Sequence, residues 1–207
     1  MIKTKDLEFN YDNQVFFKFP NINLKSNEDL LIIGSSGIGK TTLLHLLAGL
    51  LNSNSGSIEL FGKELNQLSS DHLDRFRKNN IGIVFQRPHF VNSLTVKENL
   101  QLAQYIGNKK NNNRIDSILK NLNILDKSNK KTNLLSQGEK QRASIALAIV
   151  NSPKLILADE PTSSLDDSNC SNVIKLLKKQ ATEYGAQLIV ITHDSRLKKH
   201  FNNSIEL

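Results

Sequence analysis

The sequence predicts an α/β fold in which a largely parallel sheet carries a block of helices. Residues 30–33 are apolar, and a glycine-rich turn and a helical pattern over 43–48 follow them directly. Further apolar runs at 81–85, 155–158 and 187–191 have the length of buried strands. A long segment between the runs at 81–85 and 155–158 shows a helical pattern without a strand signal. Together these features indicate an α/β core with a helical insertion.

The first 24 residues predict short antiparallel strands. Residues 5–9 alternate in polarity, 10–13 have the composition of a turn, and 16–19 and 21–24 continue the β pattern. Tyr11 falls in the predicted turn. Its ring could stack on a purine or simply pack at the edge of a strand, and both interpretations stay open at this point.

Residues 34–42 have the spacing G-x-x-x-x-G-K-[ST] of a phosphate-binding loop. They are Gly34, Ser35, Ser36, Gly37, Ile38, Gly39, Lys40, Thr41 and Thr42. Glycines let successive backbone N–H groups point into one hollow, and the helix N-terminus adds partial positive charge. Lys40 would then reach the β- and γ-phosphates of a nucleotide, and the Thr41 hydroxyl would bind Mg²⁺. The alternative is a glycine-rich turn without a ligand.

The chain between this loop and the helical block predicts a loop at 52–56, a strand at 57–61 and a polar helix at 71–78. Strand 81–85 follows, and Gln86 stands at its carboxyl end. Ligands of open α/β sheets bind at the carboxyl ends of the strands. We therefore predict that Gln86 contacts the metal ion and the attacking water.

The helical block, which runs from residue 95 to about residue 150, ends in the stretch Leu-Ser-Gln-Gly-Glu-Lys-Gln-Arg at 135–142. A helix over 143–150 is predicted to follow it. Ser136 and Glu139 have the spacing of a capping box for that helix. A capped helix N-terminus with a glycine in its first turn is also an anion site, so a structural and a binding role can hold together.

The buried strand at 155–158 ends in Asp159 and Glu160, and packing alone does not explain two carboxylates there. Asp159 would hold Mg²⁺ through water, and Glu160 would orient or deprotonate the attacking water. A turn and a helix over 168–181 come next. His193 follows the last apolar strand, where a histidine would lie near the γ-phosphate.

Composition limits the remaining possibilities. The chain has 207 residues, which suits one domain, and its single cysteine, Cys170, excludes an internal disulfide. No run of 18 apolar residues exists, so we expect no membrane-spanning segment. The net charge of +7 is spread over short lysine clusters without interleaved aromatic residues. This pattern favours a solvated basic surface over a nucleic-acid or anionic-membrane surface.

Taken together, these residues resemble the nucleotide-binding subunit of ABC transporters over nearly the whole chain. Tyr11 matches the aromatic A-loop residue, 34–42 the Walker A motif, Gln86 the Q-loop, 135–139 the signature, 155–160 Walker B, 164–166 the D-loop and His193 the switch histidine. The phrases around Gln86, Thr95 and Glu160 are similar to the lipoprotein-releasing, macrolide-efflux and cell-division group of that family.

The resemblance implies a single ABC ATPase domain with the P-loop NTPase, RecA-like core, an antiparallel β subdomain and an inserted helical subdomain. Residues 1–86 and 151–207 would form the core and the β subdomain, and 87–150 the helical subdomain with the signature. Only 14 residues follow His193, so we expect no regulatory C-terminal domain.

One motif departs from the family pattern. The family signature is LSGGQ, and this chain has Leu-Ser-Gln-Gly-Glu, so Gln137 replaces the first glycine and Glu139 the last glutamine. Ser136, which in the family contacts the γ-phosphate held by the partner subunit, and Gly138 are kept. If the position of Gln137 required a positive φ, the strain would be about 1 kcal/mol.

The resemblance implies a cytoplasmic ATPase that binds ATP and Mg²⁺ and works on the inner face of the membrane. Two subunits would sandwich two ATP molecules, in a homodimer, and drive a separate transmembrane permease, without nucleic acid. Residues 136–139 would contact the nucleotide from the second subunit. Two alternatives are a non-transport ABC ATPase that acts on DNA or ribosomes, and a regulatory subunit that binds ATP with weak turnover.

Overall fold

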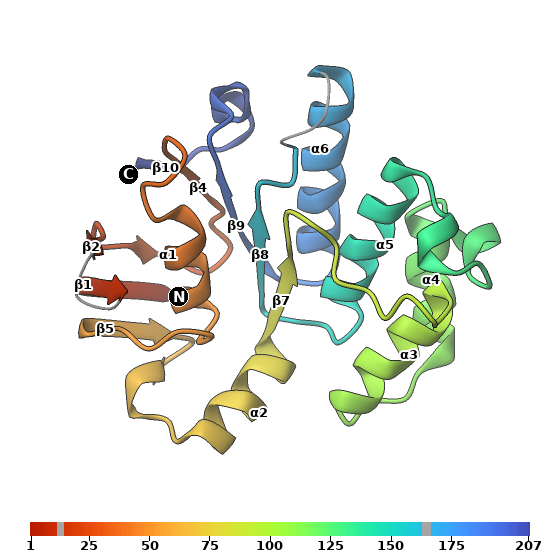
Figure 1. Ribbon diagram of the computed structural model, residues 1–207, viewed down its shortest axis with the longest axis horizontal. Coiled ribbons are helices and arrows are strands. Elements are labelled where there is room, and N and C mark those ends of the chain that lie inside the picture. The colour runs from red at the N-terminus through yellow and green to blue at the C-terminus, as the bar shows by residue number, and fades with distance from the viewer. Residues whose placement is uncertain (12–14, 163–166) are drawn as a thin grey trace.

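A computed structural model describes residues 1–11, 15–162 and 167–207. It contains two sheets, and helices lie between them and on the far side of the second sheet (Figure 1). The predicted D-loop at 164–166 lies outside the described residues. Among the residues described, none of the helices has both the length and the apolar character needed to span a bilayer.

The second sheet is parallel throughout and has the strand order β10-β4-β9-β8-β7. Its strands are β4 (Leu30–Ile33), β7 (Ile81–Val84), β8 (Leu155–Asp159), β9 (Gln187–Thr192) and β10 (Ser204–Glu206). Every residue of β4, β8 and β9 is buried, because both faces of a parallel sheet are covered. The predicted strands are confirmed, and β10 is an edge strand that the sequence did not predict.

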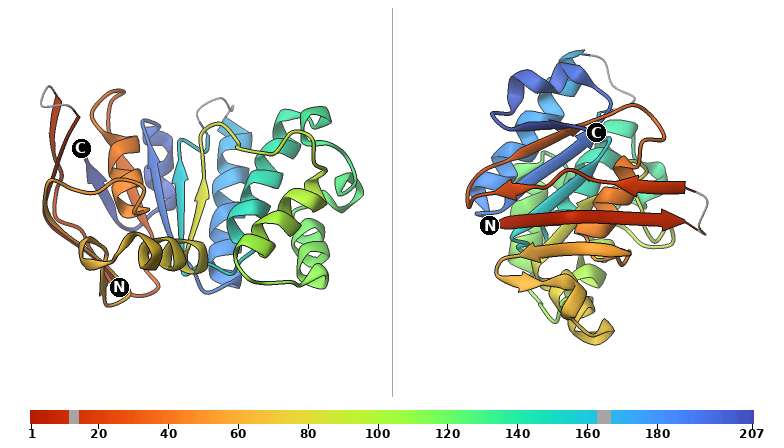
Figure 2. Two further views of the ribbon diagram at one scale, coloured as in Figure 1. Left: turned by 60° about the horizontal axis from the view of Figure 1, so that its bottom comes forward. Right: turned by 90° about the vertical axis from the view of Figure 1, so that its left-hand side faces the viewer.

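The first sheet is antiparallel and is built around the long strand β1 (Ile2–Tyr11), which faces the viewer in the right-hand view of Figure 2. β2 (Val15–Lys18) and β3 (Asn23–Leu24) pair with it on one side, β5 (Ser55–Leu60) on the other, and β6 (Lys63–Glu64) extends β5. The predicted turn at 10–13 is wrong at its start, because β1 continues through Tyr11 and pairs that residue with Val15.

Two apolar cores lie on opposite faces of the parallel sheet. Helix α1 (Lys40–Leu47) packs in the first core, between the parallel sheet and the antiparallel sheet. The other helices are α2 (Ser70–Asn80), α3 (Val96–Ile106), α4 (Asn112–Asn121), α5 (Gln137–Ile149) and α6 (Asp167–Glu183), with short 3₁₀ turns η1 (Leu65–Gln67), η2 (Leu125–Lys127), η3 (Thr132–Leu134) and η4 (Ser195–His200). Of these, α3 to α6 contribute to the second core. The layers are therefore, in order, the antiparallel sheet, helix α1, the parallel sheet and helices α3 to α6, as the left-hand view of Figure 2 shows.

Helix α5 joins the helical part to the sheet. A Cβ added to Gly82 of β7 would lie 2.1 Å from the carbonyl oxygen of Ala148, so this glycine permits the close packing of β7 on α5. The guanidinium of Arg114, on α4, donates to the carbonyls of Ile149 and Val150 at 3.0 and 2.9 Å. It thereby satisfies acceptors that the C-terminus of α5 leaves unpaired.

Candidate active site

A glycine-rich loop lies between β4 and α1, at the carboxyl end of the parallel sheet. Gly37 and Gly39 have φ values of 84° and 98°, a region that L side chains rarely adopt. Gly39 is the N-cap of α1. Lys40 is 7% exposed, and its ammonium donates to the carbonyls of Gly34 and Ser35 at 2.9 and 2.8 Å. A helix N-terminus and a buried cation therefore meet at this loop, which suits an anion.

A cavity of about 500 Å³ opens over this loop, a size that suits a nucleotide. The ends of β7, β8 and β9 contribute one wall, and β2 contributes another. Its lining residues are Phe17, Ser35, Ser36, Gly37, Gly39, Lys40, Thr41, Thr42, Gln86, Glu160 and His193. All except Phe17 are residues that the sequence predicted for the site, and they come from four separate segments of the chain.

Glu160 meets two nitrogen-bearing side chains in this cavity. Its Oε1 lies 3.5 Å from Lys40 Nζ and 2.9 Å from Nδ1 of His193. The carboxylate and the ammonium are both largely buried, whereas the imidazole is 56% exposed. Glu160 therefore faces the space above the phosphate loop, next to the cation of that loop, where a water could be activated.

The Glu160 backbone has φ 46°, in the left-handed region that disfavours residues other than glycine. Its N–H donates to the carbonyl of Ile191 at 2.8 Å and so fixes the residue beside the end of β9. A strained non-glycine residue that the surrounding structure holds in place is typical of functional sites.

Asp159 has the properties expected of a magnesium ligand. Its Oδ2 accepts a hydrogen bond from the Thr41 hydroxyl at 3.0 Å, and its Oδ1 is buried without a hydrogen-bond partner among the described residues. Burial raises the pKa of this carboxyl above its ordinary value, the bond from Thr41 opposes that rise, and the Glu160 charge adds to it. A buried acceptor without a donor next to a hydroxyl fits a bound Mg²⁺.

The described residues contain no group of three or more histidine, cysteine or acidic side chains that could hold a metal. The donors present are a hydroxyl, one carboxylate and the amide of Gln86, which lines the cavity two residues beyond β7. Magnesium characteristically binds to one or two protein groups together with phosphate oxygens. The donor set therefore fits Mg²⁺ bound together with a nucleotide.

Tyr11 lies beside the cavity and not in its lining. Its hydroxyl is 3.3 Å from the Thr42 hydroxyl, and its ring packs edge-on against Phe9 and Phe17, with centroids 4.7 and 6.3 Å away. Phe17, on β2, is the aromatic residue that lines the cavity. The sequence did not single it out, because 16–19 carries only a strand pattern and the pairing of β2 with β1 brings it there.

The predicted signature residues form the N-terminus of α5 and are not in the cavity lining. Ser136 is the N-cap, and Ser136 and Glu139 make the predicted capping box, with bonds of 2.7 and 3.3 Å. The hydrogen bond from the Ser136 N–H to the Glu139 carboxylate lowers the pKa of Glu139. Gln137 is the first residue of α5 and is not one of the residues with positive φ. The backbone strain that a positive φ would cause at Gln137 is therefore absent. The prediction that the helix begins at 143 is wrong, because it begins at Gln137.

These features define a class of protein, one that binds a nucleoside phosphate on a P-loop at the carboxyl edge of a parallel sheet. Residues 17–163 match the family described as ABC transporter, and the chain belongs to that family. It is an ATPase cassette of the ABC type, with the α/β fold of that family.

Two curated relatives illustrate the similarity. The chain is 36% identical to the lipoprotein-releasing system ATP-binding protein LolD of Wigglesworthia glossinidia brevipalpis, over 99% of this chain and 90% of that protein. It is 37% identical to the macrolide export ATP-binding/permease protein MacB of Mannheimia succiniciproducens, over 90% of this chain. It spans 29% of the MacB protein.

Solved structures agree with this assignment. A dimeric structure of MJ0796, a bacterial ABC transporter cassette, superposes with a TM-score of 0.89 at 32% identity, over 100% of this chain and 94% of that one. A dimeric post-hydrolysis state of the same cassette, bound to ADP and Pi, gives the same TM-score and identity.

Proposed function

We propose that this chain hydrolyses Mg-ATP as one of two cassettes that power a membrane permease, with Glu160 as the group that acts on water. The observation that carries the proposal is the position of the Glu160 carboxylate, which faces the cavity within 3.5 Å of the P-loop lysine. A carboxylate there can accept a proton from a water that attacks the γ-phosphate.

The remaining residues of the site divide the work of binding. Lys40 leaves the carbonyls of the loop and neutralises the β- and γ-phosphates, while the backbone of residues 34–42 surrounds them. Thr41, Gln86 and Asp159 would hold Mg²⁺, which would supply charge neutralisation on the phosphate oxygens. His193 turns from Glu160 to the γ-phosphate, and its 56% exposure leaves room for that rotation.

The base of ATP lies against the aromatic cluster at the edge of the antiparallel sheet. Tyr11 supports that surface through Thr42 and through ring contacts, and Phe17 reaches the cavity itself. The face of an aromatic side chain can stack on a purine base. We therefore place Phe17 beside Tyr11 in the base-binding part of the site.

The signature at the N-terminus of α5 acts on the nucleotide of a second copy of the chain. Ser136, Gln137, Gly138 and Glu139 stand apart from the cavity of their own chain, and the similar cassette MJ0796 is dimeric. In this arrangement a helix N-terminus approaches the γ-phosphate from the opposite subunit.

We assign residues 1–86 and 151–207 to the nucleotide-binding core and β subdomain, and 87–150 to a helical subdomain that contacts the permease. The LolD and MacB relatives, an ATP-binding protein and an ATP-binding/permease protein, support a permease partner. We also place the chain on the cytoplasmic face of the membrane, bound to a permease on a separate polypeptide, as its resemblance to the nucleotide-binding subunits of ABC transporters implies.

Phosphate release and calorimetry on the purified chain test the proposal. Lys40→Ala should weaken Mg-ATP binding at least tenfold, about 1.4 kcal/mol, since a charge-assisted contact is lost. Glu160→Gln should lower the rate by about 10² to 10⁴ while binding survives. Lys120→Ala, which removes the same charge from an exposed position of α4, is the control.

Other outcomes would point elsewhere. Unchanged affinity in Lys40→Ala would contradict the phosphate site. Hydrolysis that rises on addition of DNA or RNA would favour an ABC ATPase outside transport, and binding without turnover in the presence of the permease would favour a regulatory subunit.

A further inference from the structure

Thr192, the last residue of β9, makes contacts that tie the phosphate loop to Glu160. Its side chain is fully buried, and its hydroxyl lies 2.9 Å from Glu160 Oε2. Its carbonyl accepts a hydrogen bond from the Gly34 N–H at 3.2 Å, at the start of the P-loop. One rigid strand end therefore contacts both the phosphate-binding backbone and the carboxylate that acts on water.

The neighbouring backbone determines which way the Thr192 proton points. The Asp194 N–H donates to the Thr192 hydroxyl oxygen at 3.0 Å. Since this bond occupies a lone pair of that oxygen, the hydroxyl proton remains for the Glu160 carboxylate, which can only accept. The His193 N–H also donates to Glu160, at 3.1 Å from Oε1 and 3.3 Å from Oε2.

Nucleotide binding affects the partners of the two Glu160 carboxylate oxygens differently. Oε1 faces Lys40 Nζ and the His193 ring, both of which turn to phosphate in the proposed function. Oε2 is held by the Thr192 hydroxyl, which is buried in the sheet and has no phosphate to move to. When ATP is bound, Oε1 loses its two side-chain partners and can accept from the attacking water, while Oε2 keeps the Thr192 hydroxyl and the His193 N–H stays shared between the two oxygens.

This anchoring also accounts for the persistence of the strained Glu160 backbone. A left-handed φ of 46° costs free energy and survives only where surrounding contacts over-determine it. The backbone bond to Ile191 fixes the main chain of Glu160, and the Thr192 hydroxyl fixes the end of its side chain. Both contacts come from the last two residues of β9.

We propose that Thr192 is a positioning residue for hydrolysis, which holds Oε2 of Glu160 so that Oε1 is presented to the attacking water. The inference rests on the proposed role of Glu160 and names the group that orients it. Misplacement of a catalytic group by about 1 Å can cost on the order of 10²-fold in rate. Loss of the hydroxyl should therefore lower kcat without weakening ATP binding.

The test compares Thr192→Val with Thr192→Ser in phosphate-release kinetics. We expect kcat of Thr192→Val to fall by about 10- to 100-fold with KM for ATP within about twofold, and Thr192→Ser to stay within about threefold of the parent. The slowed variant should also accumulate as a dimer with ATP but not with ADP. Thr192→Ala carries the same expectation if the valine variant does not fold.

Thr4→Val is the matched control. The Thr4 hydroxyl, in β1, likewise accepts a backbone N–H, that of Ile22 at 2.8 Å, and lies 3.4 Å from a carbonyl oxygen. This variant should lose comparable stability while kcat is unchanged. A matching drop in kcat would show that Thr192→Val acts through stability and would overturn the proposal.

A double variant separates this inference from the proposed function. If Thr192 acts through Glu160, Thr192→Val should cause no further loss in the Glu160→Gln background. An independent loss there, or parent kcat in Thr192→Val beside an inactive Glu160→Gln, would overturn the positioning role alone. Parent kcat in Glu160→Gln would overturn both.

Discussion

Asp194 shows how the groups around one carboxyl set its charge. Its two oxygens accept hydrogen bonds from the Arg196 guanidinium at 2.8 and 2.7 Å, and Oδ1 also accepts the Arg196 N–H at 3.0 Å. The Arg196 side chain is the main cause that lowers the pKa of Asp194 from 3.8 to about 2, against the opposing effect of burial. The pair lies directly after His193, and Asp194 is the N-cap of η4.

The pH dependence of stability should therefore change in Arg196→Gln. A carboxyl with a lowered pKa contributes stability above its unfolded pKa, here near 3.8, and loses it as the pH falls through about 2. The variant should lose about 1.5–3 kcal/mol of unfolding free energy at pH 7, and this deficit should shrink below about pH 4. Urea titrations from pH 3 to pH 7 measure it.

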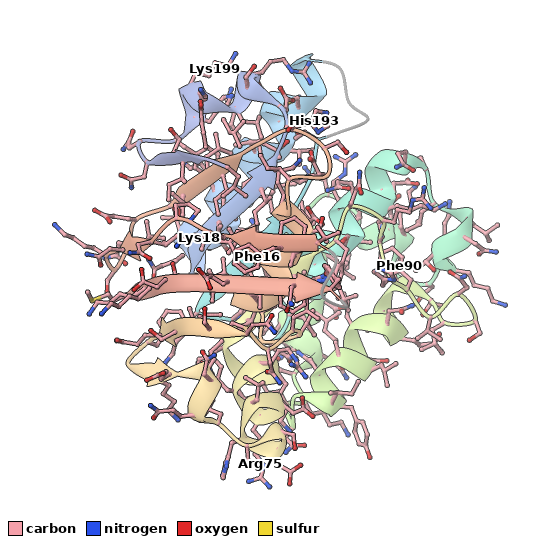
Figure 3. The ribbon with its side chains drawn as sticks, turned by 60° about the vertical axis from the view of Figure 1, so that its left-hand side comes forward. Phe16, Lys18, Arg75, Phe90, His193 and Lys199 are labelled. Carbon is pink, nitrogen blue, oxygen red and sulfur yellow. The ribbon has the colours of Figure 1, made fainter. Side chains whose placement is uncertain are left out.

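Lys199→Gln is the control, because it removes the same charge from η4 (Figure 3) without touching Asp194. It should leave the stability within about 0.5 kcal/mol of the parent at each pH. A deficit in Arg196→Gln that is equal at pH 3 and pH 7 would contradict the assigned cause of the lowered pKa.

Single residues of the site could be predicted where the neighbouring sequence has a clear strand or loop pattern. Lys40, Glu160 and His193 each follow a strand or a glycine loop directly, and the structure brings all three to one cavity. Thr192 could not be predicted, because its place depends on the pairing of β9 with β4, which lies far away in the sequence. Phe17 could not be predicted either, because its local pairing with β1 does not reveal that its ring packs against Gly39 of the phosphate loop. A threonine at the end of an apolar strand carries no signal of its own.

The loop between β7 and α3 shows how an element is held while its surface stays accessible. Asn99 of α3 is buried, and its side-chain amide accepts from the Val91 N–H at 2.9 Å and donates to the Val91 carbonyl at 3.2 Å. The Val91 side chain is nevertheless 45% exposed, whereas Phe90 packs against the second core (Figure 3). The two neighbours therefore face in different directions.

Charge substitutions at these neighbours should have opposite consequences. Val91→Glu should leave unfolding free energy within about 0.5 kcal/mol of the parent and weaken association with the permease, if this loop is the contact surface. Phe90→Glu should destabilise by more than about 2 kcal/mol, because it places a carboxylate against apolar side chains. Urea unfolding and co-purification with the permease measure the two effects.

The two variants serve as controls for each other. If Val91→Glu unfolds as Phe90→Glu does, Val91 belongs to the core in solution. If Val91→Glu is stable and still co-purifies with the permease at the parent level, the contact surface lies elsewhere on the helical subdomain.

Elements with a consistent pattern could be predicted from the sequence, and irregular ones could not. Strands β4, β8 and β9 are buried along their length and mostly apolar, because both faces of their sheet are covered. β10 is a three-residue edge strand, Ser-Ile-Glu, that is defined only by its pairing with β4. Helix α5 starts at Gln137, six residues before the predicted start, because the Ser136 cap fixes it there.

At the scale of the whole molecule, one chain does not bring together the two parts of the site that we propose. The phosphate loop and Glu160 line the cavity, while Ser136 and Gly138 stand on a helix whose N-terminus is not in the cavity lining. A second copy, related by a two-fold axis, could place each signature on the other nucleotide. The dimeric state of a cassette with a TM-score of 0.89 supports this arrangement.

Trapping of the dimer is the clearest whole-molecule prediction. Glu160→Gln keeps the shape of the side chain but removes the base, so ATP stays unhydrolysed between two subunits. The variant should elute as a dimer with Mg-ATP and as a monomer with ADP, by size-exclusion chromatography with light scattering. Glu183→Gln, an exposed position on α6, should show no ATP-dependent dimer.

The signature departures make the same experiment informative if the variant stays monomeric. Gln137 has an unstrained helical backbone, so any weakening of the dimer by this residue has to come from its side chain at the subunit contact. Glu139 adds a negative charge where a γ-phosphate would approach. Gln137→Gly and Glu139→Gln, added to Glu160→Gln, should then restore the ATP-dependent dimer. Dimerisation only after these changes would show that the native signature requires a different partner subunit, and a monomer even then would contradict the shared site.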